Sequence, residues 1–295
     1  MLLHASCALA AATAASAPLA VHVHHGLQPA AEHWAEHCAA VAADCGAGFA
    51  LHRVTLSRAG GESLEAVARD ARLAVFASLA LDAVLLAHHR DDQAETVLFN
   101  ALRGAGLGGL AGMPPRRPLA VGRGQLLRPF LDCPRAELSA YAQRHGLRWI
   151  EDPSNADTTL RRNLLRHTVL PLAEGGMPQA RAALARLAGH AVEAQRLAED
   201  LADLDAAAWS DREGLRCAAF AQLPPHRARN LLRRQLALAS VRMPDAARLD
   251  EMLRQLAGDG RPALHHEGHC VTRRRGRLRI EPMPAHDPPA GAAAD

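Results

Sequence analysis

The stretch Asp82–Thr96, which reads DAVLLAHHRDDQAET, indicates how the first half of the chain folds. Its apolar run VLLA has almost no alternation with polar residues, a pattern typical of a strand buried on both faces of a parallel sheet. We predict a strand over residues 82–89 and a helix over residues 92–103. Asp91, Asp92 and Glu95 then lie where the strand ends and the helix starts, at the sheet edge where open α/β proteins bind ligands.

The segments around this stretch repeat the same alternation of strand and helix. Short apolar runs predict strands, and runs with apolar residues three and four apart predict helices. The expected strands are 19–25, 50–56 and 126–130, and the expected helices are 29–45, 62–81 and 135–145. Residues 104–124, rich in Gly, Pro and Arg, are expected to form a long loop. Strands that alternate with such helices predict βαβ units, so the expected fold class is α/β with a parallel sheet.

The pattern changes near residues 175–178, where long helices replace the alternation. We expect helices over 178–207, 225–239 and 245–257, then a basic β-hairpin over 263–281 with a turn near Arg275–Gly276. The Pro- and Ala-rich end is expected to be disordered. The sequence therefore predicts a first domain over 1–173, a mainly helical domain over 177–281 and a tail over 282–295.

The composition of the 295 residues is that of a globular protein long enough for about two domains. Apolar residues make up 49% and charged residues 22%, and no apolar run reaches the length of about 18 residues that spans a bilayer. The alanine-rich opening has no Arg or Lys before Arg53, so it lacks the basic start of a signal peptide. We therefore expect a cytoplasmic protein without a membrane partner. The six cysteines include no CxxC pair, which argues against a disulfide framework and a zinc ribbon.

The charge is distributed unevenly along the chain. All 34 basic side chains are arginines, which excludes a Walker-type P-loop lysine and a Schiff-base lysine. Residues 1–52 carry three carboxylates and no arginine, whereas residues 161–186 carry five arginines against one glutamate. Residues 273–279 contain five more arginines. This gradient predicts a polyanionic partner for the later part of the chain.

The acidic cluster at residues 91–95 has two interpretations. Asp92 as N-cap with Glu95 three residues later fits a capping box, which requires no ligand. Capping explains Asp91 and the neighbouring histidines less well, and carboxylate oxygens at a ligand-binding edge suit Mg²⁺ that bridges nucleotide phosphates. We favour the functional interpretation because ionisable residues crowd the predicted ligand edge.

Histidines end two of the predicted strands. His22, His24 and His25 precede Gly26, and the pair His88–His89 ends the predicted strand over 82–89. Together these imidazoles would suit zinc or iron, although their spacing matches no standard metal motif. The alternative is that they line a cleft or bond to the turn of the chain.

Two further segments carry glycines and arginines. Arg103–Met113 contains five glycines within nine residues, which permits close backbone approach to a ligand, although Gly104 is also the expected helix C-cap. Trp149–Asn155 has ordinary turn chemistry and is followed by Arg161–Arg166. Arg162 and Arg166 are four residues apart, so they share one helix face, either solvated or anion-binding.

These segments, in this order, resemble the tRNA(Ile)-lysidine synthetases, a branch of the PP-loop (N-type ATP pyrophosphatase) family. The resemblance covers about residues 1–173, and the region to about 281 is similar to the family's first C-terminal domain. It is carried by HVHHGL (His22–Leu27), AHHRDDQAET (Ala87–Thr96), RGAGLGGLAGM (Arg103–Met113), the LLRPF strand that contains Arg128, and WIEDPSN…RRNLLR (Trp149–Arg166).

The resemblance implies an ATP- and Mg²⁺-dependent ligase with a PP-loop fold. In the family, ATP adenylylates the C2 oxygen of the wobble cytidine (position 34) of tRNA(Ile) with a CAU anticodon, and L-lysine then displaces AMP to form lysidine. By position, Asp91 and Asp92 would serve catalysis and, with Glu95, Mg²⁺. The implied nucleotide-binding residues are His24, His25, Gly26, His88, Arg103 and Gly104. The implied lysine or tRNA residues are Arg128, Asp152, Asn155, Arg162, Asn163 and Arg166, and a homodimer is left open.

One family motif is absent from the 295 residues. The SGGxDS loop, which wraps pyrophosphate with backbone amides, does not occur, and the opening MLLHA (Met1–Ala5) resembles the helix that follows that loop. We therefore expect a chain that starts inside its first helix, without the central strand, and whose activity as it stands is open. The other open functions are a non-catalytic tRNA-binding remnant, a metal-dependent hydrolase built on the His and Asp clusters and, disfavoured by the lack of paired cysteines, a tRNA sulfur transferase.

Overall fold

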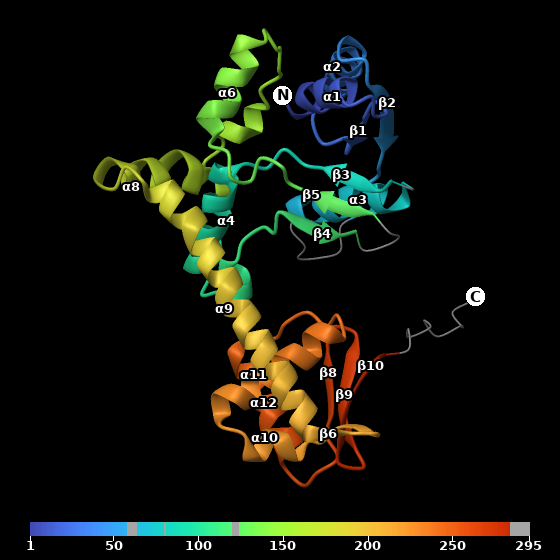
Figure 1. Ribbon diagram of the computed structural model, residues 1–295, viewed down its shortest axis with the longest axis vertical. Helices are drawn as coiled ribbons and strands as arrows, with labels where there is room; N and C mark the ends of the chain where they lie inside the picture. Colours follow the sequence, from blue (N-terminus) through green and yellow to red (C-terminus); the bar gives the residue numbers. More distant parts are fainter. Residues whose placement is uncertain (58–63, 80, 120–123, 284–295) are drawn as a thin grey trace, which may run out of the picture. The chain divides into compact units, whose positions relative to one another are not determined.

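The computed structural model describes residues 1–57, 64–79, 81–119 and 124–283, in two compact units, Met1–Val192 and Glu193–Asp295 (Figure 1). The boundary between the units falls within the long helix α9 (Ala180–Trp209), later than the predicted boundary at 173–177. All but the first two residues of the predicted tail lie outside the described part. Among the described residues, no helix is long and apolar enough to cross a membrane.

The first unit opens with two helices and a pair of parallel strands. Helix α1 (Leu2–Ala12) precedes β1 (Leu19–His24), and α2 (Ala31–Asp44) connects β1 to β2 (Gly48–Arg53). The register runs from Leu19 opposite Gly48 to His24 opposite Arg53. The predicted βαβ unit is therefore confirmed.

A second sheet in this unit has the order β3-β5-β4. Strands β3 (Ala83–Leu85) and β5 (Gln125–Leu127) are parallel, and β4 (Arg116–Pro118) pairs with β5 in the antiparallel direction. Helix α3 (Leu64–Ser78) covers this sheet, because Phe76 packs with Val84 and Leu126 in one apolar cluster. Among the described residues the two sheets are not hydrogen-bonded to each other.

The prediction of one long loop over 104–124 is wrong in its described part. Helix α4 (Arg90–Leu102) ends before it, and the segment then forms the short helix α5 (Leu107–Leu110) and strand β4. This strand was not predicted because it contains Pro118, and proline has no N–H to donate to the hydrogen bonds of a sheet. An edge strand such as β4 tolerates it.

The rest of the first unit is helical. Helix α6 (Arg135–Arg144) follows β5, a 3-10 turn spans Pro153–Ala156, and α7 (Arg161–Leu164) continues without a break into the π-helical turn η2 (Leu165–Val169) and α8 (Leu170–Gly176). Of these elements, the π-helical turn η2 contacts α4, and this contact positions the candidate site.

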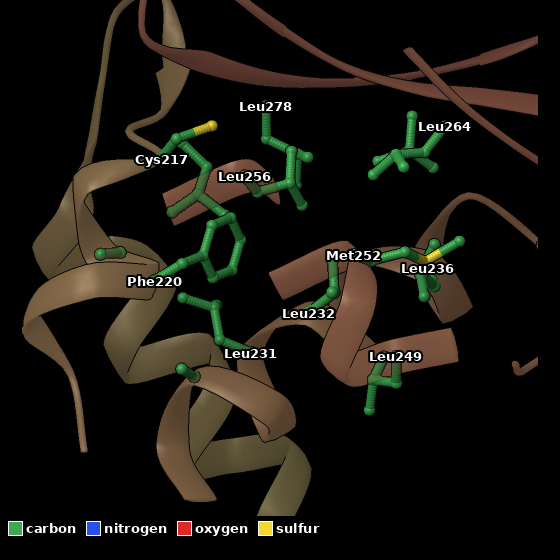
Figure 2. Packing of buried hydrophobic residues seen from close by; sticks show 14 of the residues in the cluster. Cys217, Phe220, Leu231, Leu232, Leu236, Leu249, Met252, Leu256, Leu264 and Leu278 are labelled. Carbon is green, nitrogen blue, oxygen red and sulfur yellow. The ribbon is translucent and has the colours of Figure 1, made fainter. Parts of the chain in front are cut away.

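The second unit packs three helices against a small antiparallel sheet. The helices are α10 (Ala218–Gln222), α11 (Pro225–Leu238) and α12 (Ala246–Ala257), and the sheet order is β10-β9-β8. The fully buried side chains of Leu232, Leu236 and Met252 lie at the centre of its core (Figure 2). The strands of this sheet are β8 (Ala263–His266), β9 (His269–Arg274) and β10 (Arg277–Pro282). A separate short pair consists of β6 (Ser210–Asp211) and β7 (Gly214–Leu215).

The predicted basic hairpin is part of this sheet. Its turn lies where predicted, with Arg275 at φ 50° and Gly276 at φ 74° between β9 and β10. Strand β8 adds a third strand to the predicted pair.

Candidate functional site

The first turn of α4 carries the predicted catalytic carboxylates, but the helix begins earlier than predicted. His89 is the N-cap: its Nδ1 accepts a 3.3 Å hydrogen bond from the Asp92 amide, while Asp92 Oδ2 accepts a 3.0 Å bond from the His89 amide. The capping box is therefore His89–Asp92, and the predicted box of Asp92 and Glu95 is wrong. Asp91 and Asp92 both lie in the first turn, where the helix dipole favours negative charge.

Glu95 lies one turn further along α4 and binds two arginines. Its side chain is 1% exposed; Oε1 accepts a 2.7 Å bond from Nε of Arg166, and Oε2 accepts a 3.0 Å bond from Nε of Arg162. Both arginines also reach Asp92 Oδ1, at 3.3 Å from Arg162 and 3.2 Å from Arg166. Hydrogen bonding to Glu95 raises the pKa of Arg166 above its usual value. Arg162 and Arg166 thus share one face, as predicted, and this face forms ion pairs with Asp92 and Glu95.

Asp91 has a different set of partners. Its carboxylate accepts hydrogen bonds of 3.3 Å from the Arg135 amide and from Nη1 of Arg181, and Arg181 also pairs with Glu174 at 2.9 Å. Asp91, Asp92 and Glu95 therefore each accept N–H donors. Within the described ranges, no group of three His, Cys, Asp or Glu side chains could hold a metal ion.

His88 and Arg128 meet at the ends of β3 and β5. Nε of Arg128 donates to His88 Nδ1 at 3.3 Å, and Nη1 donates to the carbonyl of Pro114 at 2.7 Å. Burial, reinforced by the nearby charges of Arg128 and Arg162, lowers the pKa of His88 to about 4 even though Asp92 opposes the shift. His88 is therefore neutral at pH 7, as its role of acceptor requires.

The histidines of β1 form a separate group. The rings of His22 and His24 have centroids 6.4 Å apart, and His24 Nε2 lies 3.3 Å from a carboxylate oxygen of Glu32. Burial lowers the pKa values of His22 and His25. Gly26 follows with φ 67°, a backbone conformation that favours glycine. His88 and His89 bond to Arg128 and Asp92 respectively, so the alternative of a metal site that joins the five histidines is not supported among the described residues.

The glycine-rich segment lies at the opposite end of α4 from Asp92. Arg103 is the C-cap, with its guanidinium over the Phe99 ring at 5.2 Å, and Gly104 follows at φ 71°. At 1.5 Å per residue, 11 residues of helix separate Arg103 from Asp92 by roughly 16 Å. The C-cap is thus Arg103, one residue before the predicted Gly104, and Gly104 ends the helix by taking the left-handed conformation directly after the cap. These two residues do not gather with the carboxylates.

Three of the predicted lysine or tRNA residues hold the chain between α6 and α7. Asp152 caps the 3-10 turn by accepting a 2.8 Å bond from the Ser154 amide. Buried Asn163 donates to the carbonyls of Ser154 and Asp157 at 2.8 and 2.9 Å, and the carbonyl of Asn155 lies 2.7 Å from His167 Nε2. These bonds fix the approach of α7 to α4, which sets the position of Arg162 and Arg166.

Sequence reasoning missed three contributors to the site. Gln93 is buried on α4 and clamps the backbone of Met113, with its Nε2 3.0 Å from the carbonyl and its Oε1 2.8 Å from the amide. The Arg135 amide and the Arg181 side chain both bind Asp91. No local signal marks them, because each acts on a residue distant in the sequence.

The parallel strand pairs and the carboxylates at the start of α4 define an α/β protein whose polar residues gather beyond the strand ends. Its fold is similar to that of a U34-tRNA thiolase from Methanococcus maripaludis, with a TM-score of 0.51 and 15% identity, over 65% of this chain and 68% of that one. The PP-loop domain family matches residues 1–173, and the TilS substrate binding domain family matches residues 215–279. The chain belongs to the PP-loop family.

Curated relatives extend the comparison to both units. The chain is 47% identical to a tRNA(Ile)-lysidine synthase of Alkalilimnicola ehrlichii over 100% of its own length and 66% of the relative's. It is 48% identical to one of Pseudomonas fluorescens, over 83% of the chain and 57% of the relative, and 44% identical to one of Ralstonia nicotianae, over 93% and 60%. The chain thus spans about three fifths of the length of these relatives.

Proposed function

We propose that this chain belongs to an ATP-dependent ligase that attaches L-lysine to C2 of the wobble cytidine of tRNA(Ile) with a CAU anticodon. The observation that carries the proposal is the 47% identity to a tRNA(Ile)-lysidine synthase across the whole chain. The matches of two families to separate segments support it, because a PP-loop domain matches residues 1–173 and a substrate binding domain matches residues 215–279. The reaction would take place in the cytoplasm, where tRNA is available.

The proposed reaction has two balanced steps. The C2 oxygen of the cytidine attacks the α-phosphorus of ATP, and pyrophosphate leaves. An amino group of lysine then attacks C2, the C2–O bond breaks, AMP leaves and the amine loses a proton. We assign catalysis to Asp91 and Asp92, which stand in the first turn of α4, and the nucleotide to the strand ends with His24, His25, Gly26 and His88. Arg103 and Gly104, at the far end of α4, are the weakest nucleotide candidates.

The described residues do not form a ready-made Mg²⁺ site. Glu95 is buried and its oxygens accept hydrogen bonds from Arg162 and Arg166, so Glu95 does not suit a hard cation in this arrangement. Asp91 and Asp92 likewise bond to N–H donors. Mg²⁺ therefore enters the proposal as the ion that accompanies ATP, and no step is derived through it.

The partners divide by charge. The ammonium of lysine requires a carboxylate neighbourhood, and Asp152 is the proposed residue with a partly accessible carboxylate. The phosphates of tRNA require cations, which Arg162, Arg166 and the basic sheet of the second unit supply. Asn155 and Asn163 would act on tRNA or lysine indirectly, by holding α7.

The test is release of AMP from ATP that depends on both lysine and tRNA. It is run with the 295-residue chain and with a fusion that adds the strand and SGGxDS loop of a relative. We expect turnover in the fusion, and a fall of about 10²-fold or more in the variant Asp92→Asn, with tRNA binding unchanged. Asp203→Asn is the matched control and should be fully active, because Asp203 is an exposed residue of α9 that pairs with Arg234 of α11.

The alternatives predict other results. A fusion that binds tRNA without releasing AMP would indicate a non-catalytic tRNA-binding protein and contradict the ligase. A metal-dependent hydrolase would instead purify with stoichiometric zinc or iron, which the described residues give no reason to expect.

A further inference from the structure

Arg128 is a buried cation without a carboxylate partner. The residue is 6% exposed, and its guanidinium donates hydrogen bonds to the carbonyl of Pro114 and to the neutral ring of His88. Within the part of the chain that the structure describes, Arg128 forms no ion pair. Burying a charge is costly unless it is paired, so the positive charge here lacks its expected compensation.

Arg117 lies beside Arg128 on the same face of the sheet. The register places Arg117 opposite Leu126, and the Arg128 amide extends the ladder by donating to the Pro115 carbonyl at 2.8 Å. Leu126 and Arg128 are two residues apart, so their side chains point to one face. Arg117 and Arg128 are therefore diagonal neighbours, with Cα atoms about 7–8 Å apart.

Helix α3 brings two more arginines to this edge. Arg69 and Arg72 precede Phe76 by seven and four residues, so they share the face with which Phe76 packs on Leu126. Because α3 leads into β3 and covers the sheet, its first turns lie toward the carboxyl ends of β3 and β5, where Arg128 is. Repulsion agrees with this placement: after burial, Arg117 and Arg69 contribute to the lowered pKa of Arg128, and Arg72 contributes to that of His88.

Around His88 and Arg128, positive charge without a carboxylate partner among the described residues comes from this group. Arg162 is also near His88, but it forms ion pairs with Asp92 and Glu95, as Arg166 does. Arg69, Arg72, Arg117 and Arg128 have no such carboxylates among the described residues, and the first three are exposed or half-buried. Guanidinium groups that converge without counter-ions at a strand end suit a phosphate group, which they bind with paired hydrogen bonds.

We infer that Arg69, Arg72, Arg117 and Arg128, the arginine cluster, form a phosphate-binding site at the carboxyl ends of β3 and β5. Buried Arg128 is the base of the site, and the three accessible arginines surround the phosphate. The inference deepens the proposed function and rests on it for the source of the phosphate, either the polyphosphate of a nucleotide or the backbone of tRNA.

The first experiment measures binding of inorganic tripolyphosphate to the full 295-residue chain by calorimetry. Arg117→Gln and the double variant Arg69→Gln/Arg72→Gln should each weaken binding about tenfold or more, since each removes charge-assisted hydrogen bonds. Arg116→Gln is the matched control, because Arg116 is the exposed neighbour on β4 whose side chain points to the other face. These accessible positions keep the test valid even if a variant of buried Arg128 fails to fold.

The second experiment measures tRNA binding by the same variants at two salt concentrations. Loss of tripolyphosphate binding with unchanged tRNA affinity assigns the site to a nucleotide. Loss of tRNA affinity with a salt slope shallower by about 1 per arginine, and no tripolyphosphate binding, assigns it to the tRNA backbone. If neither ligand distinguishes the cluster variants from Arg116→Gln, the inference is wrong. Intact phosphate binding in a fusion that forms no AMP would overturn the proposed function and leave the site standing.

Discussion

The Glu95 carboxylate and the Arg166 guanidinium form a side-on pair, with Nε 2.7 Å from Oε1 and Nη2 2.9 Å from Oε2. The two residues are 71 positions apart, so this pair connects α4 to the π-helical turn η2. Glu95 therefore acts as the residue that orients the arginines near Asp92. The Glu95 side chain is 1% exposed and accepts two hydrogen bonds from Arg166, so it has little freedom to move and keeps this end of α4 fixed.

Replacing Glu95 with Gln should destabilise the first unit. Removing one member of a fully buried ion pair costs about 3–5 kcal/mol. Because Arg162 is 39% and Arg166 20% exposed, water can partly solvate them, and we expect a loss of about 2 kcal/mol. Urea unfolding followed by circular dichroism measures this difference.

Glu174→Gln is the control for the Glu95 variant. Glu174 also accepts a hydrogen bond from an arginine, Arg181, but it is more exposed, so its loss should cost less than about 1 kcal/mol. Equal effects of the two variants would show that burial of Glu95 contributes nothing.

The stability of the first unit should depend on pH through His88. Its pKa is about 4 in the folded protein against 6.5 ordinarily, so the unfolded chain binds the proton more readily. The contribution is fully present above pH 6.5 and is lost as the pH falls toward 4. Between pH 7 and pH 5 we expect His88 to account for a loss of about 2 kcal/mol.

The difference between the wild-type chain and His88→Gln isolates this contribution. The variant cannot take up a proton, so its free energy of unfolding should fall less between pH 7 and pH 5. His190→Gln, at an exposed position on α9, should follow the wild-type pH profile. Parallel profiles for wild type and His88→Gln would contradict a lowered pKa for His88.

Gly112 should tolerate substitution less well than Gly104. Both have positive φ, 63° and 71°, which costs alanine about 1–2 kcal/mol. A Cβ at Gly112 would also lie 2.7 Å from Oε1 of Gln93, which clamps Met113, whereas a Cβ at Gly104 meets no atom within 4 Å. We expect Gly112→Ala to cost about 3 kcal/mol and Gly104→Ala about 1 kcal/mol in urea unfolding. Similar costs would indicate that the Gln93 clamp yields freely.

Local pattern was sufficient to predict most of the elements. Apolar runs located β1 and β3, and the four-residue spacing of Arg162 and Arg166 correctly placed them on one face. The helix start at His89 was not predictable, because Asp is a commoner N-cap than His, and the prediction therefore placed the cap at Asp92, three residues later.

The pairing within the site could not be predicted from sequence for a different reason. Glu95 meets Arg166 only because α7 and η2 fold back onto α4, and no local rule carries information over 71 residues. Arg128 likewise depends on a distant segment, because it donates hydrogen bonds to the carbonyls of Pro114 and Pro115, just before β4, a strand that was predicted to be a loop. Composition predicted a polyanion partner for the later arginines, but the unpaired cluster includes Arg69 and Arg72, outside those runs.

The turn of the basic sheet should show opposite effects of two neighbouring arginines. Arg275 has φ 50°, which Asn tolerates better, so Arg275→Asn should raise stability by up to about 1 kcal/mol. Arg277 pairs with Asp211, so Arg277→Asn should lower stability by up to about 1 kcal/mol.

If the sheet binds tRNA phosphates, Arg275→Asn should also weaken tRNA binding and reduce the salt slope by about 1. An unchanged salt slope, measured by filter binding at two salt concentrations, would show that this turn lies outside the RNA contact.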